Sequence, residues 1–398
     1  MLTNSMERTT TTGAAAFRRD RSTWLAYGML AYYAALQVAI SPLMVFIAPR
    51  LQLSHAGAAA HLSAFAVGMV LTGMAGTAGT RRWGRGPSFW GGALAMAIGT
   101  LGLLMAADPW LTLTSCLLMG LSGTLLLVAI QASLSDLHGP HRAVALTEAN
   151  VAATLAAMLA PLLIGGAERI GLGYRWGVLP ILLLGVAAPL STRTLAVPSV
   201  AGPSTLPREA PLSGLSARFH AWWTVVVVGV AIEWCLVFWA PLLLETTTQL
   251  SAADASLAMS VFFASMLVGR LSGSRLVRRI EAMALLQASL FLLAVGTVGL
   301  WLSRPVPVKL AALAIAGLGI ASVYPLAMSL AVGSEPHRAD AASGRVVLGV
   351  GTSLILAPLT LGWLADRVGI QPAFGAVVVA LPIVWWASVL ARRRQTTQ

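Results

Sequence analysis

Long apolar runs separated by short polar segments occupy most of this chain. A helix that crosses a bilayer needs about 20 mostly apolar residues, because each residue adds about 1.5 Å and the hydrocarbon core is about 30 Å thick. Twelve runs meet this requirement, at residues 24–48, 58–80, 88–107, 111–134, 146–166, 176–192, 219–244, 256–276, 282–303, 307–332, 346–365 and 371–391. They predict an all-α membrane protein with twelve transmembrane helices.

The composition also indicates a protein that lies in a lipid bilayer. Of the 398 residues, 57% are hydrophobic and only 10% are charged, whereas soluble domains carry about 25% charged residues. The net charge of +12 does not indicate nucleic acid, because the arginines are scattered between apolar runs and form no basic face. Cys116 and Cys235 both lie inside apolar runs and are interpreted as reduced packing thiols. Neither a disulfide framework nor metal-ligand spacing is present, and no cofactor is predicted.

The placement of lysine and arginine predicts the orientation. The first apolar run begins at Trp24 and is too long for a signal peptide, so we expect it to be retained as a helix. With twelve spans both termini lie on one side, and 20 of the 26 Lys and Arg residues fall in the termini and loops of that side. Since cytoplasmic loops carry the excess of positive charge, both termini are predicted to be cytoplasmic, in the inner membrane of a bacterium.

The chain is predicted to consist of two halves. Residues 193–218 hold four prolines with several Ser and Gly, which is typical of a linker. We therefore expect an N-terminal tail at 1–23, six-helix halves at 24–192 and 219–391, a cytoplasmic linker at 193–218 and a C-terminal tail at 392–398.

Short motifs recur in the same order in both halves, at offsets of 196–198 residues. The pairs are Gln52-Leu53-Ser54 with Gln249-Leu250-Ser251, Arg81-Arg82 with Arg278-Arg279, Pro140-His141-Arg142-Ala143 with Pro336-His337-Arg338-Ala339, Ala160-Pro161-Leu162 with Ala357-Pro358-Leu359, and Glu168-Arg169-Ile170-Gly171 with Asp366-Arg367-Val368-Gly369. Six spans per half give the repeats the same orientation. Parallel repeats of this kind occur in transporters, with the solute site between the halves near the midplane.

From Trp24 to Leu390 the chain resembles the major facilitator superfamily. The loop signature of that family, roughly Gly-x-x-x-Asp-Arg-x-Gly-Arg, is similar to residues Gly76–Arg85, without the aspartate, and to the degenerate Gly269–Arg275. A fuller match, Gly362–Gly369, follows span eleven on the outer side, so we do not assign it to the cytoplasmic gate. The resemblance implies a twelve-helix fold around a central cavity.

An alanine–proline motif in span five resembles a signature of antiporters in this family. Ala160-Pro161 is followed by Gly165-Gly166, with a spacing one residue too long, and the motif recurs at Ala357-Pro358. A motif present in both halves is better explained by packing, because small residues let helices approach closely and proline allows a kink.

Glu233 is the one acid of the 14 that lies in the middle of a predicted span. A charge there costs on the order of 2.5–3.5 kcal/mol, and no Lys or Arg is placed mid-span beside it. The side chain could bind a proton on one face of the membrane and release it on the other. Alternatively, it is a protonated residue hydrogen-bonded between helices. We prefer the first interpretation and assign proton coupling to Glu233.

Further polar and aromatic residues of the spans are candidates for the substrate cavity. In the resembled family spans one and seven line the cavity, which implies that Gln37 faces Glu233 across it. The candidates are Tyr33, Gln37, Gln131, Asn150, Trp234, Phe262 and Tyr324, any of which could also serve helix packing. Tyr324 precedes Pro325, which is expected to kink span ten.

Charged and glycine residues near the cytoplasmic span ends are candidates for a gate, in which acids would pair with arginines of the other half. They are Arg81, Arg82, Asp136, Glu148, Gly269, Arg270 and Arg275.

The sequence favours a secondary transporter of a small organic solute that works by alternating access and is coupled to protons. Efflux of cationic or amphipathic compounds is preferred. Uptake or facilitated diffusion of a neutral metabolite such as a sugar is the alternative, and a non-transporting membrane sensor is the third interpretation. No enzyme motif is found. The expected partners are the solute, protons and the lipid bilayer, and we expect a monomer.

Overall fold

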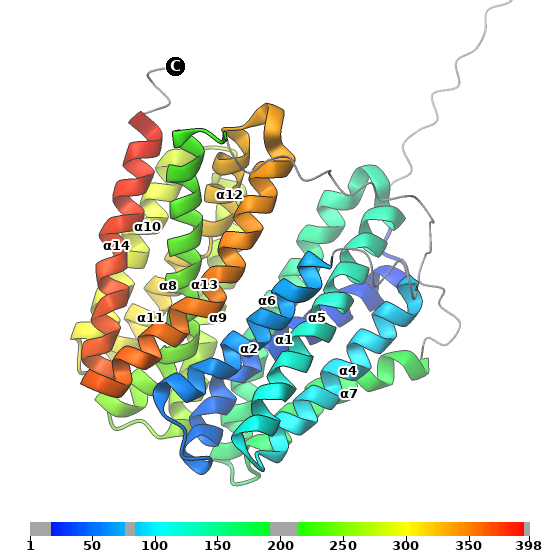
Figure 1. The fold of residues 1–398 in the computed structure, drawn as a ribbon, viewed down its shortest axis with the longest axis vertical. Helices are drawn as coiled ribbons and strands as arrows, with labels where there is room; N and C mark the ends of the chain where they lie inside the picture. Colours follow the sequence, from blue (N-terminus) through cyan, green and yellow to red (C-terminus); the bar gives the residue numbers. More distant parts are fainter. Residues whose placement is uncertain (1–16, 76–83, 192–213, 394–398) are drawn as a thin grey trace, which may run out of the picture.

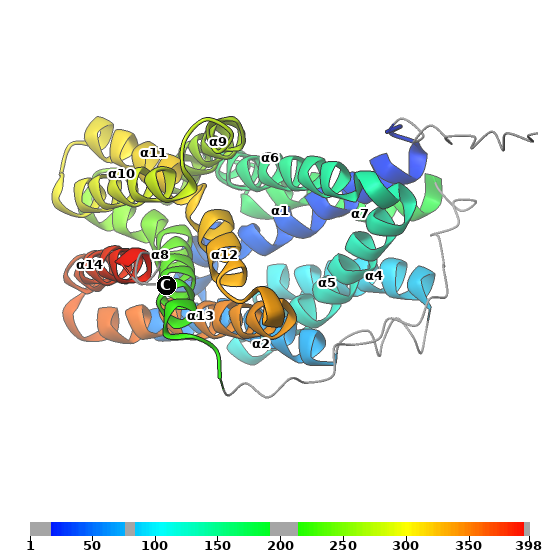
Figure 2. The same cartoon turned by 90° about the horizontal axis from the view of Figure 1, so that it is seen from above.

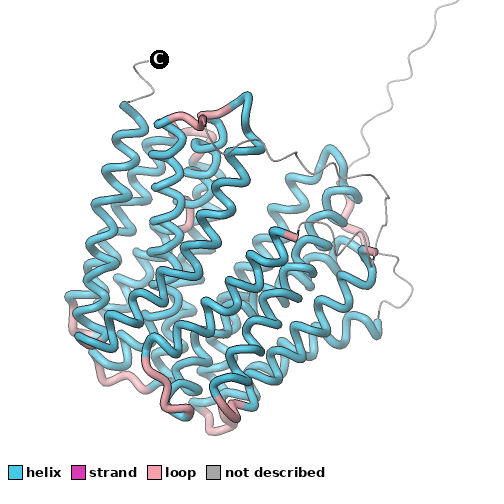
Figure 3. The backbone as a smooth tube through the Cα atoms, in the orientation of Figure 1, coloured by secondary structure: helices cyan, strands magenta, loops and turns pink. Residues whose placement is uncertain are grey.

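Every element of the chain described by the computed structural model, residues 17–75, 84–191 and 214–393, is a helix (Figures 1 and 3). The predicted all-α fold is confirmed. The first half comprises α1 (Arg21–Arg50), α2 (His55–Met74), α4 (Arg85–Met105), α5 (Pro109–His138), the 3-10 turn η1 (Gly139–His141), α6 (Arg142–Arg169) and α7 (Tyr174–Ser191). The second half comprises α8 (Ala217–Thr247), α9 (Ala252–Leu276), α10 (Ala282–Leu302), α11 (Val306–Ile320), α12 (Val323–Gly333), η2 (Pro336–Arg338), α13 (Ala339–Val368) and α14 (Ile370–Arg393).

Ten helices in the described residues are long and apolar enough to cross a membrane. One of these ten is the run Pro109–Arg169, in which α5, η1 and α6 follow one another without a break, and Tyr174–Gly185 of α7 is apolar but shorter. The chain is thus a multi-span membrane protein. The number twelve remains a prediction.

The repeated motifs form the same local structures, helix starts and short turns, in both halves. Ser54 and Ser251 are N-caps whose side chains accept the backbone N–H of Gly57 and of Asp254, so that each starts the second long helix of its half. The Pro-His-Arg motifs form η1 and η2, the short turns that lead into α6 and α13. The predicted linker and tails lie largely outside the described residues, at 192–213, 1–16 and 394–398.

The two halves meet at one end of the molecule and diverge toward the other (Figure 1). α1 begins and α14 ends at the diverging end, which we term the terminal end, and the opposite end is the closed end. Seen from above, α6 of the first half lies beside α9 of the second, and α2 lies beside α13 (Figure 2).

Two charged contacts join the halves at the closed end. Asp366, near the end of α13, accepts hydrogen bonds from the backbone N–H groups of His55 at 2.6 Å and Ala56 at 3.0 Å, and its Oδ1 lies 2.9 Å from the His55 ring. A carboxylate is stabilised at a helix N-terminus by the exposed N–H groups and the helix dipole. On the other pair of helices, Arg169 Nη1 lies 2.8 Å from Asp254 Oδ1.

Equivalent glycines allow the close approach of the halves there. A Cβ atom at Gly165 would lie 2.7 Å from the carbonyl oxygen of Ala253, and one at Gly362 would lie 2.8 Å from that of His55. Both glycines follow a proline inside the same helix, Pro161 in α6 and Pro358 in α13. This geometry agrees with the interpretation of the alanine–proline motif as a packing element.

Candidate functional site

Glu233 lies near the middle of α8. It is 16 residues from Ala217 and 14 from Thr247, or about 24 and 21 Å along the axis. The side chain is half-buried. None of the hydrogen bonds found among the described residues involves its carboxyl. The alternative interpretation was a glutamate hydrogen-bonded between helices. No hydrogen bond among the described residues supports it.

The contact between α1 and α8 places Gln37 and Glu233 on the same level. The hydroxyl of Ser41 donates a 2.6 Å hydrogen bond to the carbonyl oxygen of Val237. Gln37 and Glu233 each lie four residues earlier, one turn toward the terminal end, and both are half-buried. That the two side chains face each other across a cavity, as the family resemblance implies, stays a prediction.

Arg270 of α9 joins the two halves of the molecule. Its Nη1 donates a 2.7 Å hydrogen bond to the hydroxyl of Thr154 in α6. The sequence places Arg270 toward a span end and assigns it to the gate, and that assignment stays a prediction. The long flexible stem of the side chain lets the guanidinium lie far from its own backbone.

Tyr324 lies where span ten is interrupted. α11 ends at Ile320 and α12 begins at Val323. The break has a local cause, because the ring of Pro325 clashes with the carbonyl of the residue four positions earlier, Ala321, and proline has no N–H to donate. The Tyr324 side chain is 39% exposed. Interrupted helices with free backbone groups at their ends are typical of solute sites in transporters.

The remaining cavity candidates differ in their surroundings. Tyr33 Oη and Gln37 Nε2 each lie 3.8 Å from the sulfur of Met69. Phe262 is fully buried against Phe263, so it contributes to packing in this arrangement. Trp234 is half-buried, and Gln131 is exposed.

Asn150 is exposed and lies one turn toward the terminal end from Thr154, on the same side of α6. Its Nδ2 donates to the carbonyl oxygen of Leu146 in its own helix at 2.8 Å. The amide therefore extends the polar strip that begins at Thr154.

The two acids that were assigned to the gate form ion pairs within the first half. Glu148 accepts two hydrogen bonds from Arg19, at 2.8 and 2.6 Å, and one from Tyr27 at 3.0 Å. Asp136 forms an ion pair with Arg85. These contacts tie together the helix ends of the first half, and the expected pairs between halves stay a prediction.

The other gate candidates contribute packing or lie at a helix end. A Cβ atom at Gly269 would lie 2.6 Å from Cβ of Ala321, so this glycine lets α9 pack on the interrupted span. Arg275 lies exposed in the last turn of α9. Arg81 and Arg82 lie outside the described residues.

Two of the residues that join the halves, Thr154 and Asp366, are not among the site residues predicted from the sequence. The aspartate belongs to the motif Gly362–Gly369, which the span order places on the outer side. Its equivalence to Glu168–Gly171 was a signal that could have found the closed-end contact, since a repeated motif at a span end indicates a repeated role.

Comparison with known proteins identifies the class. The family model of the Major Facilitator Superfamily matches residues 23–337, and the chain belongs to this family. It is therefore a membrane transporter by family, as the resemblance implied.

One relative matches part of the chain. An uncharacterized transporter of Sinorhizobium fredii, y4wD, is 27% identical over 146 residues, a match that spans 37% of this chain and 37% of that protein's length.

Solved transporters share the fold. A bacterial homolog of the human lysosomal transporter Spinster, in an inward-facing and unoccupied conformation, superposes with a TM-score of 0.74 at 15% identity, covering 94% of this chain and 96% of that one. The nucleoside transporter NupG gives 0.69 at 16% identity, with 94% and 97% covered. The fucose:proton symporter FucP of E. coli gives 0.59 at 16% identity, with 93% and 99% covered.

Proposed function

We propose that this protein is a proton-coupled secondary transporter of a small organic solute that works by alternating access. The observation that carries the proposal is the half-buried carboxyl of Glu233 in the middle of α8, for which the described residues offer no hydrogen-bond partner. Arg270, from the same half, donates a hydrogen bond to Thr154 of the other half. A coupled transporter must link proton binding to one arrangement of the halves, and we infer that Arg270 provides this link.

The coupling follows from competition for Arg270. When Glu233 is charged, it attracts the guanidinium toward α8 and weakens the hydrogen bond to Thr154. When Glu233 is neutral, Arg270 is free to bind Thr154, which stabilises the contact between α6 and α9. A proton taken up by the carboxylate on one side is released on the other after the halves have rocked.

The positions of the basic residues support a bacterial inner-membrane location with both termini in the cytoplasm. In that orientation the terminal end, where the halves diverge, faces the cytoplasm. The chain then has an inward-facing arrangement, closed toward the periplasm by Asp366 and Arg169.

The solute is a neutral or amphipathic organic molecule. We infer that Arg270 offsets the charge of Glu233, so a simple cation loses the attraction that an isolated carboxylate would offer. Efflux of an amphipathic compound and uptake of a neutral metabolite both fit. The fold shared with a fucose:proton symporter and a nucleoside transporter supports the second.

The test is transport by purified protein in proteoliposomes. A thermal-shift screen against metabolites and drug-like compounds selects the solute, and its accumulation is then measured under an imposed pH gradient. Glu233→Gln should abolish proton-driven accumulation and leave solute exchange. The matched control is Glu245→Gln, which removes an acid at the far end of the same helix and should accumulate solute normally.

Two results would contradict the proposal. Accumulation by Glu233→Gln at the level of the unmodified protein would remove this residue from coupling. Absence of flux for every solute that stabilises the protein would favour a membrane sensor instead.

A further inference from the structure

The flank formed by α13 and α14 is the part of the bundle most open to lipid. In the most apolar stretch of each of these helices 39% of the residues are buried, against 72% in α1. Along α13, Leu356, Thr360, Trp363 and Arg367 follow at intervals of four, three and four residues and are all exposed. This spacing places them on one face of the helix, which the other described helices leave uncovered.

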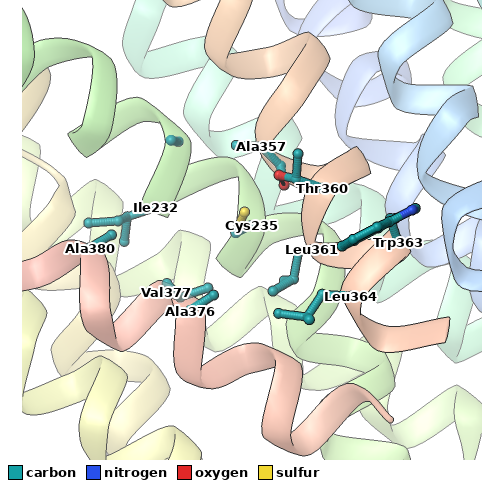
Figure 4. Close-up of a pocket in the computed structure, with 11 residues that line it drawn as sticks. Ile232, Cys235, Ala357, Thr360, Leu361, Trp363, Leu364, Ala376, Val377 and Ala380 are labelled. Carbon is teal, nitrogen blue, oxygen red and sulfur yellow. Dashed lines mark hydrogen bonds between the residues drawn. The ribbon is translucent and has the colours of Figure 1, made fainter. Parts of the chain in front are cut away.

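A groove of about 350 Å³ lies on this flank, between α13, α14 and α8 (Figure 4). Its walls are almost entirely apolar and include Ile232, Cys235, Leu361, Leu364, Val377 and Ala380. The one hydroxyl, of Thr360, already donates to the carbonyl oxygens of Leu356 and Ala357, at 2.8 and 3.0 Å. A polar solute therefore has no group to bind there, whereas a hydrocarbon chain has complementary walls.

The groove is separate from the candidate solute site. Cys235 lines it from α8, and Glu233, two residues away, projects about 200° further around the same helix. The two sites thus occupy opposite faces of α8.

A fixed cation stands at the closed-end edge of the groove. The guanidinium carbon of Arg367 lies 3.4 Å from the ring centroid of Trp363, which itself lines the groove. Arg367 Nη1 also donates to the carbonyl oxygen of Trp363 at 3.0 Å. The neighbouring acid, Asp366, is engaged with His55, and none of the ion pairs among the described residues involves Arg367. Tryptophan and arginine at a span end are placed at the level of lipid headgroups.

We propose that this groove binds one phospholipid, with an acyl chain along the walls and the phosphate on Arg367. The positive charge of Arg367 favours an anionic headgroup over a zwitterionic one. The site is independent of the transported solute.

The experiment is native mass spectrometry of the purified protein in micelles that contain phosphatidylglycerol and phosphatidylcholine in equal amounts. The unmodified protein should retain one lipid, with phosphatidylglycerol preferred. Arg367→Gln should lower that preference about fivefold, since a basic residue near the surface contributes this order of attraction. Arg304→Gln, at the closed end but away from the groove, is the matched control and should keep the preference.

A second pair of variants tests the groove itself. Ala380→Phe fills it and should lose both lipids, whereas Val379→Phe, on a side chain that is 68% exposed and outside the lining, should retain them. Equal retention in all five proteins would overturn the proposal, because it would mean unspecific lipid around the bundle. If Ala380→Phe does not fold, the result for Arg367→Gln decides. An unchanged preference for phosphatidylglycerol in that variant would by itself overturn the proposal.

Discussion

Asp366 in the second half caps helix α2 of the first half, with its Oδ1 2.6 Å from the backbone nitrogen of His55. Helix caps normally come from the residue that precedes the helix, and here Ser54 occupies that position as well. The additional cap from the other half turns the start of α2 into a contact that exists only while the closed end is closed.

Replacing Asp366 by Asn should favour opening of the closed end. The substitution removes the negative charge that the α2 dipole stabilises, at a cost of about 1 kcal/mol, which raises the ratio of opened to closed molecules about fivefold. Electron-resonance distances between spin labels at Arg50→Cys and Thr246→Cys, two exposed positions in different halves, measure that ratio.

The control for this change is Asp108→Asn, which removes the same negative charge from the N-terminus of α5. Asp108 caps a helix of its own half, so the protein should lose stability without a change in the distance distribution. An unchanged distribution in Asp366→Asn would show that the capping contact does not hold the halves together.

Replacing Thr154 by Val should impair coupling. Valine keeps the volume and removes the acceptor for Arg270, so proton binding at Glu233 no longer acts on the contact between the halves. We expect proton-driven accumulation to fall about fivefold, as for the loss of about 1 kcal/mol from a partly exposed hydrogen bond. Solute exchange at equal pH should change less.

Thr154→Ser should restore accumulation because it restores the hydroxyl. Thr147→Val is the matched control, since Thr147 lies in the same helix and donates only to the carbonyl oxygen of Ala143. Equal accumulation by Thr154→Val, Thr147→Val and the unmodified protein would exclude the hydrogen bond from coupling.

Replacing Gly269 by Ala should destabilise the second half. The new Cβ would lie 2.6 Å from that of Ala321 and 2.9 Å from the carbonyl oxygen of Leu318, so α9 and α11 must separate, at a cost of about 1–3 kcal/mol. The melting temperature of the purified protein should fall. Gly166→Ala, which has open space around its Cβ, should leave it unchanged or raise it, and a fall of equal size would contradict the packing argument.

The orientation is tested by fusions to the C-terminus. A fluorescent protein that folds only in the cytoplasm should be bright when fused after Gln398, and alkaline phosphatase, which needs the periplasm, should be inactive there. The opposite pair of results would invert the topology and turn the closed end toward the cytoplasm.

Much of the fold can be predicted from the sequence because its signals are local. Membrane spans are visible as stretches that are apolar along their whole length, since lipid solvates every face of a helix. Ser54 and Ser251 start helices through their own side chains, and Pro325 interrupts one through its own ring. The isolated position of Glu233 in an apolar run is equally local.

The partners of the charged side chains could not be predicted from local sequence. Arg270 of α9 binds Thr154 of α6 because these two helices pack side by side, whereas its position in the sequence indicates only a span end. Glu148 and Asp136 are expected from the sequence to pair across the halves, and in this arrangement they bind Arg19 and Arg85 of their own half.

The sequence by itself determined a multi-span membrane protein with one acid in the middle of an apolar run and with short motifs that recur in the same order. These properties are local: hydropathy depends on the residues within each run, and the repeat depends on short motifs of neighbouring residues. Only the tertiary structure decided which end is closed, that Asp366 caps α2, and that Arg270 binds Thr154. Those contacts between the halves join residues more than 100 positions apart, and their geometry depends on how two half-bundles lean against each other.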